Sequence, residues 1–422
     1  MLIMATVIRS VAAFAPSNGF RPYDQALRMP GVARKAWSLS MTVENGARLT
    51  QSRNTQGEVR SILGIYDDSQ SLISGIFQPL SPMESTYKTL WQSWYSPTDD
   101  GKMANVHMTG SFKQSQLLVS AGYNNLFMGL PGIFGIHVHV PFVTKKIHDV
   151  RIVDQTPSPA TLFRPTPYIQ AGLIQPYMKN FEANVIGLSG PSYDSWQRDG
   201  LGDLALMLDW TKDFAQEKEA LKNVNLFAQF GFSMPTAVQR NEDKALSMSL
   251  GNDGAWGMPA GIGMHLDFIN HLRAGVEADF LYLFDKSRVR RMKTHVGQTE
   301  FLLLNKGEAT KEHGLLWQFH LYLEAVQIVS GFSARVGYQF IKKDRDRLVP
   351  RNNDFNYDIV NSARSLQESS QHNILARIDF DSAKSFIGNV LVPQVGIFYK
   401  YSLDAKGALN NDSFGAQLAL HF

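Results

Sequence analysis

The last ten residues of the chain, Ser413–Phe422, read SFGAQLALHF. Apolar residues alternate here with small or polar ones, and successive side chains of a β-strand point to opposite faces. One face of such a strand carries Phe414, Ala416, Leu418, Leu420 and Phe422. The stretch therefore predicts a strand with one apolar face and one polar face.

The same alternation recurs along the chain. It is clear in 272–284, 315–325, 332–340, 373–380 and 391–403, and similar runs occur near 36–50, 115–123, 133–143, 202–210, 223–233 and 260–269. Together these stretches predict an all-β protein of about twelve strands. Segment 105–123 changes phase near Lys113–Gln116, and 57–76 carries apolar residues without clear alternation. Fourteen strands is therefore an alternative.

Composition removes several classes of protein. The 422 residues include 41 Lys and Arg against 38 Asp and Glu, with no cysteine. Such a balance argues against a nucleic-acid partner, and the lack of thiols excludes a disulfide scaffold. No stretch reaches the roughly 18 apolar residues of a spanning helix. A mean hydropathy of -0.18 with 44% apolar residues fits a soluble β protein or a transmembrane β-barrel with a polar interior.

The connections between the predicted strands alternate in length. Those near 124–132, 214–222, 270–272, 327–331 and 383–388 are short, whereas 51–104, 144–200, 234–258, 285–312 and 344–370 are long and polar. Outer-membrane barrels join their strands by short periplasmic turns and longer external loops. The pattern predicts a transmembrane antiparallel up-and-down β-barrel with both termini on the periplasmic side.

This topology also sorts the aromatic residues by height. The external ends of the strands receive Tyr282, Trp317, Tyr338, Tyr399 and Tyr401, and the periplasmic ends receive Trp210 and Phe422. Amphipathic rings favour the membrane–water interface. We therefore expect these residues to form two aromatic girdles.

Two short stretches resemble known families. The terminal Phe422, in phase with the apolar face, resembles the C-terminal signature of bacterial outer-membrane barrels. This implies a bacterial outer-membrane location and recognition of the last strand by the barrel-assembly machinery. Residues 200–208, GLGDLALML, resemble the Gly-Leu-Gly-Asp opening strand of the outer-membrane family associated with the meta-pathway of phenol degradation, a relative of the fatty-acid transporter barrels. That resemblance implies uptake of small hydrophobic or aromatic compounds.

The polar faces of the strands would point into the barrel. We expect the pore lining to include Asp203, Asp267, Arg273, Glu277, Asp279, His320, Glu324, Arg335, Arg377, Asp379 and Lys400. These residues predict either a charge-lined pore that slightly favours cations or a salt-bridge network that keeps the barrel closed. Both interpretations stay open.

Motifs for other chemistry are weak. His137 and His139 share the inward face, but no third ligand stands at a fixed spacing, so no metal site is predicted. The sequence has no GxSxG elbow or phosphate-binding loop, and we expect neither an enzyme nor a cofactor. The basic stretch 285–293, DKSRVRRMK, predicts contact with lipopolysaccharide phosphates or anionic solutes, or else a solvated loop.

The chain is expected to form one domain. Residues 1–33 are interpreted as the remnant of an export signal or a periplasmic segment, and 34–422 as a single transmembrane barrel. Segment 51–104 is too long for a bare loop and predicts a plug or constriction.

The first functional hypothesis is a channel or transporter for passive passage of small solutes, hydrophobic or aromatic ones among them. The alternative is a structural or adhesion barrel with a closed lumen and partner-binding loops. In either case the expected partners are outer-membrane lipid and lipopolysaccharide, with a small-molecule solute in the first.

Overall fold

The computed structural model describes residues 35–54, 57–63, 69–71, 105–127, 129–154, 181–187, 190–329, 331–382 and 391–422. The expectations for 1–33, for the turn at 383–388 and for most of 51–104 concern segments outside these described residues.

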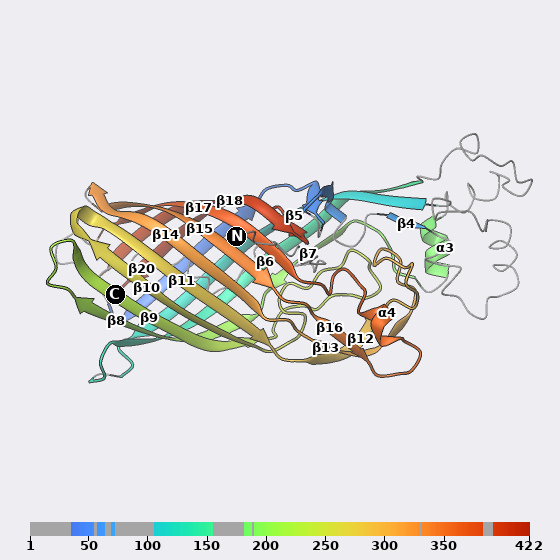
Figure 1. Ribbon diagram of the computed structural model, residues 1–422, viewed down its shortest axis with the longest axis horizontal. Coiled ribbons are helices and arrows are strands. Elements are labelled where there is room, and N and C mark those ends of the chain that lie inside the picture. Colours follow the sequence, from blue (N-terminus) through green and yellow to red (C-terminus); the bar gives the residue numbers. More distant parts are fainter. Residues whose placement is uncertain are drawn as a thin grey trace, which may run out of the picture.

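Twelve antiparallel strands close into a barrel (Figure 1), as the sequence predicted. Around the wall the order is β5–β1–β20–β18–β17–β15–β14–β11–β10–β9–β8–β6, and β6 pairs with β5 to close the circle. Their bounds are Trp37–Gly46 (β1), Asn105–Asn124 (β5), Ile133–Asp154 (β6), Leu204–Ala215 (β8), Leu221–Met234 (β9), Gly257–Phe268 (β10), Leu272–Leu283 (β11), Leu316–Val329 (β14), Phe332–Lys343 (β15), Ser369–Asp381 (β17), Val392–Lys406 (β18) and Ser413–His421 (β20).

The alternative of fourteen barrel strands is wrong. Strand β5 runs without interruption from Asn105 to Asn124 and pairs with β6 along its length. Its register with β6 shifts between Thr109 and Ser111, where a step of two residues along β5 corresponds to three along β6, so the extra residue of this β-bulge lies on β6. The inward parity of β5 continues through the predicted break, with buried side chains at Met108, Phe112, Gln114 and Gln116. The sequence pattern changes phase there because the inward residues change from apolar to polar.

The two ends of the barrel differ. At the turn end, on the left of Figure 1, short connections join β8 to β9, β10 to β11 through the 3-10 helix η5 (Ile269–His271), and β14 to β15. At the loop end, β12 (Lys286–Arg291), β13 (Lys306–Glu312) and β16 (Arg347–Pro350) form a small sheet beside the helix α4 (Tyr357–Val360). This difference agrees with the predicted short turns and long loops.

Further elements extend the loop end. A second small sheet joins β2 (Gln51–Arg53), β3 (Val59–Ser61) and β19 (Ala408–Leu409), while β4 (Ser69–Ser71) and β7 (Trp196–Leu201) lengthen the wall beside β5 and β6. The helix α3 (Phe181–Gly187) lies on the same side of the molecule (Figure 1). Within the described residues, no helix is long and apolar enough to cross a membrane.

The last strand closes the barrel against the first. Trp37 donates a backbone hydrogen bond of 2.9 Å to the carbonyl of Phe422, and Phe422 donates one of 3.1 Å in return. From there β20 pairs residue by residue with β1 and, on its other side, with β18. A closed barrel leaves no strand edge unpaired around its circumference.

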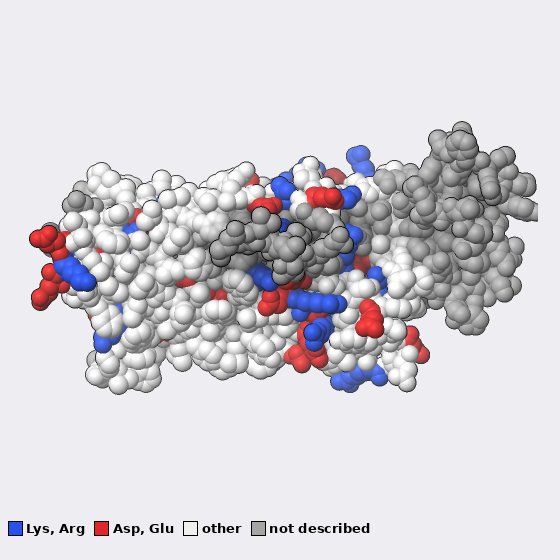
Figure 2. Space-filling model, viewed as in Figure 1, with Lys and Arg blue, Asp and Glu red and all other residues white. Residues whose placement is uncertain are grey.

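The outer wall is apolar. Figure 2 shows a broad band with almost no charged side chains, flanked by charged groups at the turn end and toward the loops. We call it the apolar band. Its outward residues are exposed by 52% to 59% at Ile262, Leu321, Leu323, Val336 and Ile397. Contiguous apolar surface of this extent needs a lipid or protein cover, and a band around a closed barrel fits the hydrocarbon of a membrane.

Candidate functional site

The inward face of the wall is polar and buried. Along β14, Gln318, His320, Tyr322 and Glu324 all point inward and are only 1% to 2% exposed. They share a face because they stand two residues apart on one strand. The inward rings lie close against the wall, since a Cβ added at Gly275 on β11 would overlap the ring of Tyr322.

A row of ion pairs crosses four strands near the turn end. Arg273 on β11 pairs with Asp267 on β10 at 2.5 Å, and its other side approaches Glu324 on β14 at 3.7 Å. Arg335 on β15 reaches the same Glu324 carboxylate at 3.1 Å. Each of these residues stands directly opposite its partner in the strand register. We call the four residues the charge ladder.

The next cross-strand pair has like charges. Arg335 stands opposite Arg377 on β17, and each guanidinium turns to its own carboxylate. Arg377 binds Asp379 at 2.7 Å and donates a 2.8 Å hydrogen bond to Gln417 on β20. The predicted inward residues Arg377 and Asp379 therefore meet, and Arg377 connects them to the last strand, β20.

A buried carboxylate with two histidines lies above the ladder. Glu277 on β11 contacts His265 on β10 at 3.1 Å and His320 on β14 at 3.0 Å. The rings of His265 and His320 lie against Tyr322, with centroid distances of 5.7 Å and 5.3 Å, and Phe227 packs on His265 at 4.9 Å. The guanidinium of Arg335 covers the other side of the Tyr322 ring at 4.2 Å. Such contacts combine ring stacking with cation–π attraction.

Amide side chains form a second row toward the loop end. Asp279 on β11 accepts hydrogen bonds from Gln229 on β9 at 3.0 Å and from Gln318 on β14 at 2.6 Å. The row continues from Gln318 to Gln339 at 3.3 Å and from Gln339 to Asn373 at 3.2 Å. Hydrogen bonds thus connect strands from β9 to β17 across the inner surface.

On the far side of the barrel, Lys400 on β18 lies 3.8 Å from Glu44 on β1, and Ser413 on β20 donates to the same carboxylate. Tyr322 was expected on the polar face of its strand but not among the pore-lining residues, and Glu44 and His265 were missed. His265 could have been found by extending the period-two alternation of its strand, because it has the parity of Asp267; no inward residue was predicted on the strand of Glu44.

Asp203 has a different role from the other predicted residues. It stands where β7 gives way to β8, and its carboxylate accepts hydrogen bonds from the backbone amides of Ala237, at 3.0 Å, and Asn252. Both amides belong to the loop between β9 and β10. Asp203 therefore holds this loop over the barrel, and the GLGD stretch supplies a loop anchor.

The sequence and the fold were compared with known proteins. No family model matches the sequence, and no curated protein matches it. Among solved structures, an outer membrane channel from Pseudomonas putida superposes with a TM-score of 0.52 and 9% identity, over 93% of this chain and 98% of that one. The two proteins share a fold. The transport unit of the autotransporter AIDA-I from Escherichia coli (TM-score 0.38, 9% identity, 94% and 92% covered) is less similar. So is a Pseudomonas aeruginosa FadL homologue (TM-score 0.31, 9% identity, 97% and 98% covered).

The aromatic residues of the predicted girdles face outward. Tyr282, Tyr399, Tyr401 and Phe422 are 45% to 50% exposed, and Trp210, Trp317 and Tyr338 are half-buried. Trp317 packs edge-to-face on Phe340 at 5.2 Å near the loop end. At the turn end, Trp210 donates a 3.0 Å hydrogen bond to the carbonyl of Pro131. The positions agree with two girdles, whose contact with lipid stays a prediction.

The stretch 285–293 is not a solvated loop. Most of it forms strand β12, and Arg290 and Arg291 are each only 7% exposed. Arg288 and Arg290 instead bind carboxylates of the loop between β9 and β10. Contact of this stretch with lipopolysaccharide stays a prediction.

One cluster has the residue types of a hydrolase but not the arrangement. Ser111, His148 and Asp149 meet beside the bulge between β5 and β6. Ser111 Oγ lies 3.0 Å from both His148 Nδ1 and Asp149 Oδ2, and farther, 3.3 Å, from His148 Nε2. Asp149 also contacts Nδ1 of this ring, at 2.6 Å. In a catalytic triad the serine and the carboxylate use opposite ring nitrogens, and the serine is accessible. Ser111 is only 1% exposed, so it lacks access to a substrate.

The two inward histidines of HVHV take separate partners. His137 contacts Asp209 at 2.7 Å, and His139 contacts Ser120 at 2.8 Å. Across the part of the chain that the structure describes, no three His, Asp or Glu residues gather as metal ligands.

Proposed function

We propose that the protein is a channel of the bacterial outer membrane that lets small solutes cross passively. The observation that carries this proposal is the pairing of two surfaces on one closed wall: the apolar band outside and the buried polar rows inside. A barrel that is apolar outside and polar inside can stand in a lipid bilayer and offer polar solutes a path through its interior. The fold shared with an outer membrane channel supports the proposal.

The solutes we propose are small and amphipathic, with aromatic compounds among them. The ring cluster of Phe227, His265, Tyr322 and His320 supports this choice, because it offers flat surfaces for stacking inside the barrel. The hydroxyl of Tyr322 and Nε2 of His320 are buried and have no hydrogen-bond partner among the described residues. They could bond a polar group of such a solute.

A second candidate is a structural barrel with a closed lumen. It is favoured by the burial of the charge ladder, whose Glu324 and Arg335 are 1% and 5% exposed and bridge neighbouring strands. A network of this kind could hold the wall rigid and the interior shut.

Conductance of the full-length protein, refolded and inserted into planar bilayers, separates the two candidates. For a channel we expect steady steps, and we expect Glu324→Gln to change their size or ion selectivity by removing an inward charge. The outward substitution Val329→Asn, at the turn end of the same strand, is the control and should leave the steps unchanged. A heat-modifiable, β-rich protein that never conducts would favour the closed barrel.

A further inference from the structure

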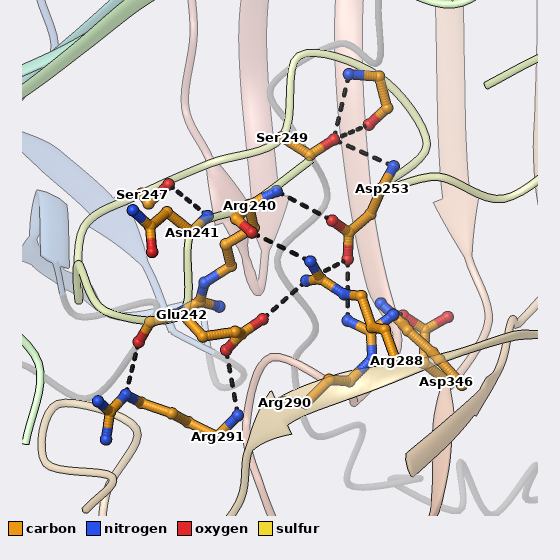
Figure 3. Close-up of polar contacts among 12 residues, drawn as sticks. Arg240, Asn241, Glu242, Ser247, Ser249, Asp253, Arg288, Arg290, Arg291 and Asp346 are labelled. Atoms are coloured by element: carbon orange, nitrogen blue, oxygen red, sulfur yellow. Dashed lines mark hydrogen bonds and ion pairs between the residues drawn. The ribbon is translucent and has the colours of Figure 1, made fainter. Parts of the chain in front are cut away.

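The loop between β9 and β10 packs against β12 through a buried polar cluster (Figure 3). At its centre, Oδ2 of Asp253 accepts hydrogen bonds from Arg288 Nη2 and Arg290 Nη1, both at 2.8 Å. Arg288 also binds Glu242 at 2.7 Å and the carbonyl of Arg240 at 3.0 Å. One carboxylate oxygen thus serves two guanidinium groups.

Arg290 keeps one whole edge of its guanidinium unused. Its Nε and Nη2 atoms are buried and have no hydrogen-bond partner anywhere in the described chain, and the residue is 7% exposed. These two nitrogens point the same way from the planar group. This edge is one that binds a carboxylate or phosphate with two parallel hydrogen bonds.

Lys145 adds a positive charge without a direct ion pair to the same cluster. The residue is 6% exposed, and its Nζ donates one hydrogen bond of 2.8 Å, to the carbonyl of Ser249. Within the described ranges no carboxylate lies at ion-pair distance from it. The hydroxyl of Ser249 accepts a 3.1 Å hydrogen bond from the backbone of Asp253, which ties Lys145 to the two arginines. Burial lowers the pKa of Lys145 to about 8, so the group is still mostly protonated at pH 7.

Positive charge also exceeds negative charge around the cluster. The cations linked to the cluster by ion pairs or electrostatic contacts are Lys145, Arg240, Arg288, Arg290, Arg291, Lys306, Lys311 and Lys343, and the carboxylates are Asp203, Glu242, Asp243, Asp253 and Asp346. His313 adds no charge at neutral pH, because burial and the nearby Lys311 lower its pKa to about 3. Buried charge without a counter-charge is unfavourable, and a bound anion would relieve it.

We propose that Arg290, Arg288 and Lys145 form a binding site for the anionic group, a carboxylate or phosphate, of a small solute at the loop end of the barrel. The Nε–Nη2 edge of Arg290 binds the oxyanion in two places, and Lys145 supplies a point charge. Because Arg290 is buried inside the loop cluster and not on the outward wall, the oxyanion belongs to a solute and not to a lipid headgroup. As the entry point for a solute, the site rests on the proposed channel function.

The test measures thermal unfolding of the full-length refolded protein in detergent free of lipopolysaccharide. Sodium phosphate and sodium acetate are the probes, each compared with sodium chloride at equal ionic strength. We expect at least one probe to raise the midpoint in a saturable way, and Arg290→Gln to weaken the apparent affinity tenfold or more. Arg290→Lys keeps the charge but loses the planar edge, and should also weaken binding.

Arg347→Gln is the matched control, since Arg347 is an exposed arginine on β16 of the same small sheet. It should bind both probes like the unmodified protein. No saturable shift with either probe would overturn the proposal, as would equal losses in the Arg290 and Arg347 variants. A shift with purified lipopolysaccharide alone would assign the oxyanion to a lipid and overturn the solute site.

This readout is independent of conduction. Anion binding by a barrel that never conducts would remove the channel function and keep the site. Steady conductance without any saturable anion effect would keep the channel function and remove the anion site.

Discussion

Lys145 places an ammonium group where bulk water does not reach it. Burial lowers its pKa from 10.5 to about 8, although Asp203 and Asp253 oppose the shift. Between these two values the unfolded chain holds a proton that the folded protein has released, so this group makes the free energy of unfolding rise with pH. Below pH 8 both states are protonated, and the full penalty of the buried charge is present.

We therefore expect Lys145→Met to be more stable than the unmodified protein at pH 6 to 7, with the difference shrinking above pH 8 and vanishing above about pH 10.5. Denaturant unfolding of both proteins in detergent, in chloride buffer without phosphate, measures it. A variant that is less stable at pH 7 would contradict the buried, charged state of this lysine.

Gly275 and Tyr322 occupy one space on neighbouring strands. A side chain at Gly275 would overlap the Tyr322 ring, which is held between His320 and Arg335. Overpacking of this kind typically costs about 1–3 kcal/mol. We expect Gly275→Val to lower the free energy of unfolding by roughly that amount, and the same change in a Tyr322→Ala background to cost clearly less. Equal losses in both backgrounds would show that the ring does not fill the space.

At the residue scale, alternation was sufficient to predict which side chains face inward. Glu277, Glu324 and Arg377 are buried on the inner face because strand parity leaves no other choice. The ion-pair partners of these residues could not be predicted from the sequence. Which carboxylate meets which guanidinium depends on the register between strands, and long loops do not fix that register in advance.

Among the loops, the segment 235–256 between β9 and β10 is held near both of its ends by one side chain, Asp203. Asp203 binds its backbone at both Ala237 and Asn252, and charged hydrogen bonds of this type contribute about 1.5–3 kcal/mol each. We expect Asp203→Ala to loosen the loop and to speed tryptic cleavage at the exposed Lys244. Asp199→Ala, the control, removes an exposed carboxylate from the neighbouring β7, and trypsin should cleave this variant at the same rate as the unmodified protein. Unchanged cleavage in the Asp203 variant would mean that the loop is held by its other contacts.

Elements beyond the apolar band were the hardest to predict. Strand β6 was expected over 133–143 but continues to Asp154, and β5 was expected over 115–123 but begins at Asn105. Their extensions pair with each other outside the band, where neither face has to be apolar. Strand β12 was not predicted, because a run of arginines in a sequence is typical of a solvated surface. In the structure Arg288 and Arg290 pair with Asp253 of the loop between β9 and β10.

At the scale of the whole molecule, the apolar band depends on the closure of the barrel. Every strand in the circle has two paired neighbours, so the polar backbone is satisfied within the wall and the outer side chains are free to be apolar. The twelve strands were predictable because an apolar outer face and a polar inner face impose a strict alternation on each strand. The same alternation carries no information on whether a path runs through the interior, since inward residues of a channel and of a closed network are equally polar.

The band itself gives a depth-dependent prediction along one strand. Leu321 is 52% exposed in the middle of β14, and Val329 is 65% exposed where β14 meets the turn end. In a lipid bilayer an arginine costs roughly 2–4 kcal/mol at the midplane and about 0–1 kcal/mol near the interface. We expect Leu321→Arg to destabilise the protein by the larger amount and Val329→Arg by the smaller, measured by reversible unfolding from lipid vesicles. In detergent micelles, whose thickness adapts to the protein, the difference should shrink. If Val329→Arg were the more damaging of the two, the hydrocarbon would have to lie nearer the turn end than the apolar band implies.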